Sequence, residues 1–142
     1  MTAEFIVAVH AAVYLNHKKE YMSSEEIAEN VCTNPARIRK IMNKLKAAKI
    51  IKVRSGIAGG YAISKDAKSL TLYDILNAVG ENFVSVKWRS GSDCAECPIS
   101  RNMKPVMDNI FDSLDECAKN KLKAVTIDDI DNQIFNSKNS HE

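Results

Sequence analysis

The sequence of 142 residues lacks any long apolar segment. A helix that spans a bilayer needs about 18 or more apolar residues in a row, and no run of this chain approaches that length. The N-terminal stretch TAEFIVAVHAAVYL also lacks the basic start and the small-residue cleavage site of a secretory signal. We therefore expect a cytoplasmic protein with no membrane partner, folded as one domain with an appended element.

The groups that would carry catalysis are missing as well. No nucleophile is matched with a base, no paired carboxylates mark a pocket, and no loop has the pattern of a cofactor site. The glycine-rich stretch GIAGGY is neither a dinucleotide fingerprint nor a phosphate loop, because no helix follows it directly. These absences predict that the protein is not an enzyme.

A strong net charge is also absent, but the small total of +2 conceals an uneven distribution. Residues 1–70 carry 12 Lys+Arg against 6 Asp+Glu, whereas residues 71–142 carry 8 against 12. The first half is therefore the one suited to a polyanion such as nucleic acid.

The first half has the pattern of a helix-turn-helix. Apolar residues at helical spacing predict a helix over residues 2–18. In MSSEEIAENV, Ser23 and Glu26 form a capping box, and Met22 can pack on Ile27. A second helix then starts at Asn34 as cap, with Pro35 in the first turn. The three or four residues between the two helices match the turn of a helix-turn-helix.

The second helix of this pair presents a basic face. Its buried stripe consists of Ile38, Ile41, Met42 and Leu45, which leaves cationic and polar residues outside. A solvated surface is the ordinary explanation of such a face, but the position as recognition helix favours the major groove. The predicted DNA contacts of this helix are Asn34, Ala36, Arg37, Arg39, Lys40, Asn43 and Lys44.

A β-hairpin follows in KIIKVRSGIAGGYAIS. Two short β-prone runs, 50–53 and 61–63, flank a glycine-rich loop. The hairpin is a candidate wing that touches the DNA backbone or the minor groove. Its predicted DNA contacts are Lys52, Arg54, Gly59, Gly60 and Tyr61.

The run from SSEEIAENV through the basic helix to AGGYAISKDAKSLTLYDILNAVGE resembles the Rrf-two (Rrf2) family of bacterial transcription regulators. This family includes the iron–sulfur cluster regulator, the nitric-oxide-sensitive repressor and the cysteine-metabolism repressor. The resemblance is strongest over residues 23–80 and extends to about residue 135. It implies a mainly α fold with a small β-hairpin wing, and a DNA-binding homodimer. One departure is Ser55-Gly56, where the family often has Arg-Gly at the start of the wing turn.

The second half contains a long amphipathic helix. Val106, Met107, Ile110, Phe111, Leu114, Ala118, Leu122 and Val125 form its apolar stripe. A compact winged domain cannot cover a stripe of that length, so a symmetric partner is the simplest cover. The resemblance agrees, since family members dimerise through a long helix here. A two-fold dimer places recognition helices roughly 34–36 Å apart, which predicts a pseudo-palindromic operator on double-stranded DNA.

These patterns divide the chain into four segments. Residues 1–80 form a winged helix-turn-helix domain, and residues 81–103 form a linker and sensor loop that carries CAEC. Residues 104–136 contain the dimerisation helix, with a start near Lys104, and a short terminal helix capped by Thr126 and Asp129. Residues 137–142 are a frayed tail.

The four cysteines leave several interpretations open. In a reducing cytosol structural disulfides are disfavoured. Cys94 and Cys97 form a single CxxC pair, whereas structural zinc sites have two. Cluster-binding members of the family carry three cysteines in this loop, and here Cys117 on the long helix is the nearest third thiol. Idle or buried thiols remain the ordinary alternative, to which Cys117 is assigned.

Cys32 lies in the turn beside the cap of the recognition helix. If the long helix packs across the winged helix-turn-helix domain of the partner, as the resemblance implies, Cys97 or Cys94 lies near Cys32 of the other chain. An intersubunit disulfide then makes the protein a redox sensor, with no cofactor.

We therefore predict a homodimeric, sequence-specific transcriptional regulator, most simply a repressor, that senses oxidation through these cysteines. One alternative is a regulator that depends on an iron–sulfur cluster held by Cys94, Cys97 and Cys117. The other is a winged helix that binds proteins and has no DNA target.

Overall fold

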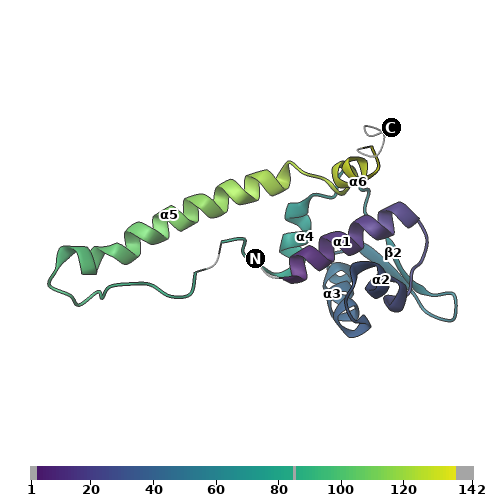
Figure 1. Cartoon of the computed structure of the whole chain (residues 1–142), viewed down its shortest axis with the longest axis horizontal. Helices are drawn as coiled ribbons and strands as arrows, with labels where there is room; N and C mark the ends of the chain where they lie inside the picture. Colours follow the sequence, from purple (N-terminus) through teal and green to yellow (C-terminus); the bar gives the residue numbers. More distant parts are fainter. Residues whose placement is uncertain (1–2, 85, 137–142) are drawn as a thin grey trace.

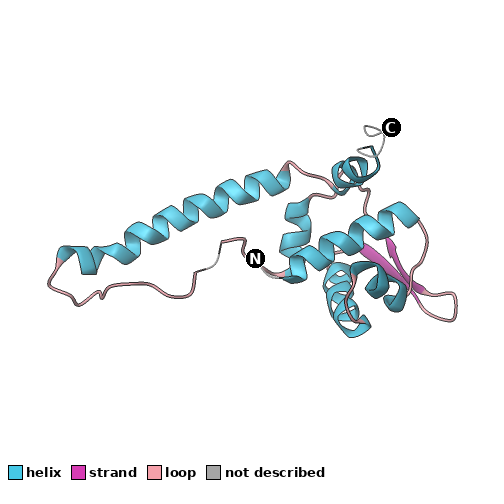
Figure 2. Cartoon of the chain, viewed as in Figure 1, coloured by secondary structure: helices cyan, strands magenta, loops and turns pink. Residues whose placement is uncertain are grey.

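The computed structural model describes residues 3–84 and 86–136. The elements follow the order α1 (Ala3–Lys18), α2 (Ser24–Val31), α3 (Pro35–Ala47), β1 (Ile51–Arg54), β2 (Gly60–Ile63), α4 (Leu72–Val79), α5 (Pro98–Lys123) and α6 (Ile127–Asn136). In the described ranges the only sheet is the antiparallel hairpin of β1 and β2 (Figure 2). The mainly α fold with a small wing is confirmed.

Local signals fix the ends of α2 and α4. Ser23 and Glu26 form a capping box on α2, and Thr71 and Asp74 form one on α4. Gly80 ends α4 in the left-handed conformation with φ of 74°. Each device satisfies backbone groups that a helix end leaves unpaired, so contacts within a few residues define where these helices begin and end.

All the helices and both strands contribute to the core of the winged domain, but α5 contributes only its last turn. Its fully buried side chains include Leu15, Ile27, Ile38, Ile41, Met42, Leu45, Ile50, Leu70, Ile75, Leu76 and Ile127. The apolar stripe of α3 is buried as predicted, which fixes the opposite side of this helix toward solvent. Burial of a large aliphatic side chain stabilises a fold by about 1.5–3 kcal/mol, so this cluster supplies most of the driving force.

The long helix α5 projects from this domain as an arm (Figure 1). It begins at Pro98, so the start near Lys104 predicted from the sequence is wrong. Pro98 occupies the first turn, where its missing N–H costs nothing, and Pro105 lies inside the helix. The segment before α5 contacts it, since the Val84 N–H donates to Asp115 Oδ1 at 3.1 Å. Of the described helices, none is long and apolar enough to cross a membrane.

The short helix α6 packs on α1 and therefore belongs with the winged domain rather than with the arm. The chain returns from α5 directly beside the start of α4, because Leu72 N–H donates to Val125 and Ile127 N–H donates to Leu70, both at 2.9 Å. Thr126 and Asp129 cap α6 as the sequence predicts. The predicted frayed tail, 137–142, lies outside the described residues.

Candidate nucleic-acid interface

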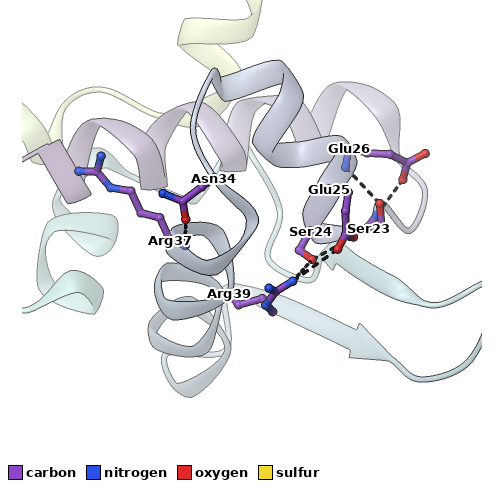
Figure 3. A network of polar contacts seen from close by, with 7 residues as sticks. All are labelled: Ser23, Ser24, Glu25, Glu26, Asn34, Arg37 and Arg39. Carbon is purple, nitrogen blue, oxygen red and sulfur yellow. Dashed lines mark hydrogen bonds and ion pairs between the residues drawn. The ribbon is translucent and has the colours of Figure 1, made fainter.

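The turn between α2 and α3 orients the candidate recognition helix. Cys32 ends α2 in the left-handed conformation with φ of 63°. Asn34 then caps α3, with its Oδ1 accepting from Arg37 N–H at 2.8 Å, and Pro35 fills the first helical position. On the other side, Ser23 Oγ accepts from Glu26 N–H at 3.1 Å (Figure 3). Local hydrogen bonds therefore define where both α2 and α3 begin.

The solvent side of α3 carries the residues that the sequence predicts as DNA contacts. Ala36, Arg39, Lys40 and Asn43 are exposed, and Arg37 and Lys44 are half-buried. The Arg37 side chain extends away from the polar network of α2 (Figure 3). Among the described residues it makes no ion pair, so its guanidinium is available to a phosphate or a base edge.

Arg39 is held against α2 by polar contacts. Its Nη1 donates to Ser24 Oγ at 3.0 Å and to Glu25 Oε1 at 3.4 Å (Figure 3). The guanidinium has five donors, so these two contacts leave others for DNA. The interaction with α2 restricts the Arg39 rotamer and fixes its place on the surface of the helix pair.

Lys40 and Lys44 point to α1 instead of standing free. Lys40 Nζ lies 2.9 Å from Glu4 Oε1 and Lys44 Nζ lies 2.7 Å from Glu4 Oε2. The hydrogen bonds from Lys44 and then Lys40 lower the pKa of Glu4 to about 2. Lys44 also donates to the Val79 carbonyl at 3.3 Å. The Glu4 carboxylate thus competes with a phosphate for both lysines, and these two contacts stay predictions.

Glu4→Gln is expected to lower the free energy of unfolding by about 1 kcal/mol at pH 7, a modest amount because Lys40 is largely exposed. The pKa of Glu4 is depressed from 4.5 to about 2, so its stabilisation is present above pH 4.5 and is lost as the pH falls toward 2. Urea unfolding of both proteins between pH 7 and pH 2.5 measures the difference.

The matched control is Glu20→Gln, which neutralises an exposed carboxylate that makes no ion pair within the described ranges. It is expected to leave stability unchanged. A Glu4→Gln deficit that is the same at every pH contradicts the ion-pair explanation and assigns the effect to packing.

The wing is anchored at its base, and its cations lie there. Arg54 stacks 4.1 Å above the Tyr21 ring and donates to the Ala58 carbonyl at 2.6 Å. Lys52 Nζ lies 5.8 Å from the centre of the same ring. Both side chains are exposed and stay candidates for phosphate contact. Tyr21 was not predicted from the sequence, because it lies 33 residues before Arg54 and no local pattern links the two.

Three residues predicted as wing contacts have packing roles in the structure. Gly60 has φ of 145°, and a Cβ there would lie 2.3 Å from the Met22 carbonyl oxygen. A Cβ on Gly59 would lie 2.1 Å from the Arg54 carbonyl oxygen. Tyr61 exchanges backbone hydrogen bonds with Met22 at 2.8 and 2.9 Å. These contacts join the wing to the start of α2, and contact of the same residues with DNA stays a prediction.

All four cysteines are free and exposed, including Cys117, whose neighbours on the apolar stripe had suggested burial. Cys97 is the N-terminal cap residue of α5. The backbone N–H groups of Ser100 and then Ile99 lower the pKa of its thiol, which favours the reactive thiolate. Cys32 and Cys97 lie on different parts of the chain, one in the recognition turn and one at the start of the arm.

The predicted cluster ligands do not come together within one chain. Cys97 caps α5 and Cys117 lies twenty residues further along it, a separation of about 30 Å at the rise of an α-helix. In the part of the chain that the structure describes, no three His, Cys, Asp or Glu side chains are grouped to hold a metal ion. These thiols therefore do not fit an iron–sulfur cluster bound by a single chain.

Within residues 3–84 and 86–136, two apolar surfaces are exposed to solvent. The first is a groove of about 620 Å³ between α1 and α6, lined among others by Ile6, Val9, Val13, Ile134 and Phe135. The second is the stripe of α5, on which Val106, Ile110 and Leu114 are exposed. Only Leu122 of α5 is buried. Exposed apolar areas of this extent mark interaction surfaces.

Comparisons with known proteins agree over almost the whole chain. A family model described as Rrf2, iron-dependent transcriptional regulator, matches residues 1–133. The Bacillus subtilis (strain 168) protein YwnA, named as an HTH-type transcriptional regulator, is 28% identical over 137 residues, which cover 95% of this chain and 99% of YwnA.

Two solved structures share the fold. A protein from Lactobacillus plantarum, described as a transcriptional regulator, has a TM-score of 0.78 at 22% identity and covers 100% of both chains. The oxidised form of Staphylococcus aureus CymR has a TM-score of 0.70 at 16% identity, with 92% of this chain and 94% of that chain covered.

Proposed function

Because the chain belongs to the Rrf2 family of transcriptional regulators, we propose that it represses transcription as a homodimer that binds a pseudo-palindromic operator. The family and the similar proteins are regulators and not enzymes. The observation that carries the proposal is the solvent side of α3, with Arg37, Arg39 and Asn43 directed outward next to an anchored wing. In this arrangement α3 enters the major groove, and Lys52 and Arg54 meet the flanking phosphates.

The two uncovered apolar surfaces support the homodimer. A two-fold axis lets the arm of each chain cover apolar surface of the other, so both surfaces leave water in one interface. The dimer then presents two recognition helices to adjacent major grooves, roughly 34–36 Å apart. A double-stranded operator with matching half-sites is the corresponding partner.

Selection of duplexes from a randomised DNA pool tests the proposal. We expect a two-fold-related sequence whose affinity falls steeply with salt, because each phosphate contact releases about 0.9 counterions. Arg37→Ala is expected to weaken binding of the selected duplex about tenfold and to make the salt dependence shallower.

The matched control is Lys121→Ala, which removes one exposed cation from the last turn of α5, outside α3 and the wing. It is expected to bind the selected duplex like the wild type. Failure to enrich any sequence, with weak and salt-insensitive binding to all DNA, contradicts the proposal and favours a winged helix that binds proteins.

We further propose that the input signal is oxidation, through a disulfide between Cys32 and Cys97 of the partner subunit, with Cys94 as the alternative partner. The exposure of all three thiols and the lowered pKa of Cys97 support this chemistry. A similar fold in the oxidised form of CymR is consistent with it. The disulfide would join the winged domain of one chain to the arm of the other. Peptide mapping of the oxidised protein tests it.

The description of the family as iron-dependent favours a second candidate, a regulator whose cluster is held between chains. Visible absorbance of the protein after anaerobic purification would support that candidate. A colourless protein with full DNA binding contradicts it.

A further inference from the structure

The tip of the wing carries one large apolar side chain that packs on nothing. Ile57 has a relative exposure of 111%, the highest among the exposed large hydrophobic side chains of the described residues. The loop joining β1 to β2 lies at the opposite end of the molecule from the start of α5 (Figure 1).

This exposure is built into the loop. The Gly59 N–H donates to the Gly56 carbonyl at 3.0 Å, which closes a tight turn around Ile57. Gly56 has φ of 103°, a conformation that a side chain would strain. The backbone lies too close to Arg54 at Gly59 and to Met22 at Gly60 for a Cβ, and the hydrogen bonds between Tyr61 and Met22 hold the hairpin on the winged domain. Ile57 is thus presented at the tip by a specified backbone.

The charged residues of the wing lie at its base and not at its tip. From Ser55 to Gly60 no residue is charged. Arg54 folds back onto Tyr21 and the Ala58 carbonyl, so its guanidinium stays at the base. The wing therefore has cations at its base and a single apolar side chain at its end.

That distribution fits the minor groove, where phosphates line the edges and sugars and base edges line the interior. Proteins that bind there commonly insert an apolar side chain against the bases. We propose that Ile57 enters the minor groove beside each half-site and packs on A·T base pairs, whose groove floor lacks the guanine amino group. This inference rests on the proposed function, since it names a specificity residue of the same DNA interface.

Ile57→Ala tests the contact from the protein side. We expect the affinity for the duplex selected by the wild type to fall at least tenfold, because each of the two wings loses the apolar area that Ile57 buries against DNA. The salt dependence is expected to stay unchanged, since no charge is removed. Val53→Ala is the matched control, because it trims an exposed apolar residue of the same hairpin away from the tip. Circular dichroism checks that both variants fold.

Inosine tests the contact from the DNA side. A G·C pair placed at the flanking minor-groove position and then replaced by I·C loses only the guanine amino group from that groove. We expect this replacement to raise wild-type affinity several-fold and to leave Ile57→Ala unaffected.

The outcomes separate the two proposals. If no duplex is enriched by the wild type, the proposed function fails and the role of Ile57 fails with it. If a duplex is enriched but wild type and Ile57→Ala bind it equally, or both respond equally to inosine, only the role of Ile57 is overturned.

Discussion

Replacing Ile110 and Leu114 by glutamate is expected to make the protein monomeric and to weaken operator binding at least 100-fold. Both side chains are exposed in the single chain, at 47% and 52%, and one turn of α5 separates them. In the proposed dimer they are buried, so the double variant places four carboxylates in an apolar interface. Burial of unpaired charges costs several kcal/mol, more than the apolar contacts there contribute.

The loss of operator binding follows from the loss of the second half-site. A monomer offers one recognition helix and one wing, so it forfeits half of the base and phosphate contacts. Sedimentation velocity measures the assembly state, and fluorescence anisotropy with the selected duplex measures the Kd. Because α5 contributes only Leu122 to the core, the winged domain of the variant is expected to stay folded, which a thermal melt checks.

Asn109→Glu with Asn120→Glu is the matched control for this prediction. It adds the same charge to the same helix at two exposed polar positions outside the apolar stripe. The control is expected to remain dimeric and to bind DNA like the wild type. A wild-type protein that sediments as a monomer at micromolar concentration would contradict the proposed dimer, and the apolar stripe of α5 would then need a different partner.

Brief treatment with hydrogen peroxide is expected to produce a covalent dimer that has lost at least tenfold in operator affinity. The Cys97 thiolate attacks one peroxide oxygen and becomes a sulfenic acid, and the other oxygen leaves as hydroxide. The Cys32 thiol of the partner subunit then displaces water from that sulfur and forms the disulfide. Peroxide is the two-electron oxidant, and the two thiols supply both electrons.

The expected loss of affinity has a geometric cause. The disulfide ties the recognition turn of one chain to the arm of the other and fixes one separation of the two α3 helices. A separation that differs from that of adjacent major grooves lowers affinity for the operator. Non-reducing mass spectrometry with peptide mapping identifies the linked cysteines, and anisotropy before and after reduction measures the change.

Serine variants separate the possible pairings. Cys32→Ser is expected to prevent the covalent dimer, and Cys117→Ser is the matched control that leaves it intact. Cys97→Ser and Cys94→Ser compared side by side assign the second sulfur. Oxidised protein that stays non-covalent, with Cys32 recovered as a free thiol, rules out this switch.

Most helices and strands of the winged domain were predictable because the sequence signals that define them are local. The Ser23–Glu26 and Thr71–Asp74 boxes, the Asn34 cap and the period of apolar residues in α3 each act within a few residues. The hairpin was predicted for the same reason, since glycines mark its turn. Such patterns place helices and strands before any tertiary structure is known.

The errors and omissions come from long-range packing. Pro98 and Pro105 are both acceptable in the first turn of a helix, so the sequence alone does not distinguish a start at Pro98 from one near Lys104. The sequence also gave no indication that Glu4 pairs with Lys44, forty residues away, or that α6 returns to α1. Exposed cations looked equally available in the sequence, whereas the structure gives several of them partners.

The two hydrogen bonds between Leu70–Leu72 and Val125–Ile127 have a consequence for the length of α5. They join the start of α4 to the start of α6, so the winged domain is closed where α5 returns to it, and α5 adds only Leu122 to the buried core. A deletion or insertion of one helical turn in α5, about 5.4 Å, would change the reach of the arm without disturbing the core. In the proposed homodimer, such a change in α5 would alter the spacing of the two half-sites that the dimer binds, while the winged domain that contacts each half-site stays the same.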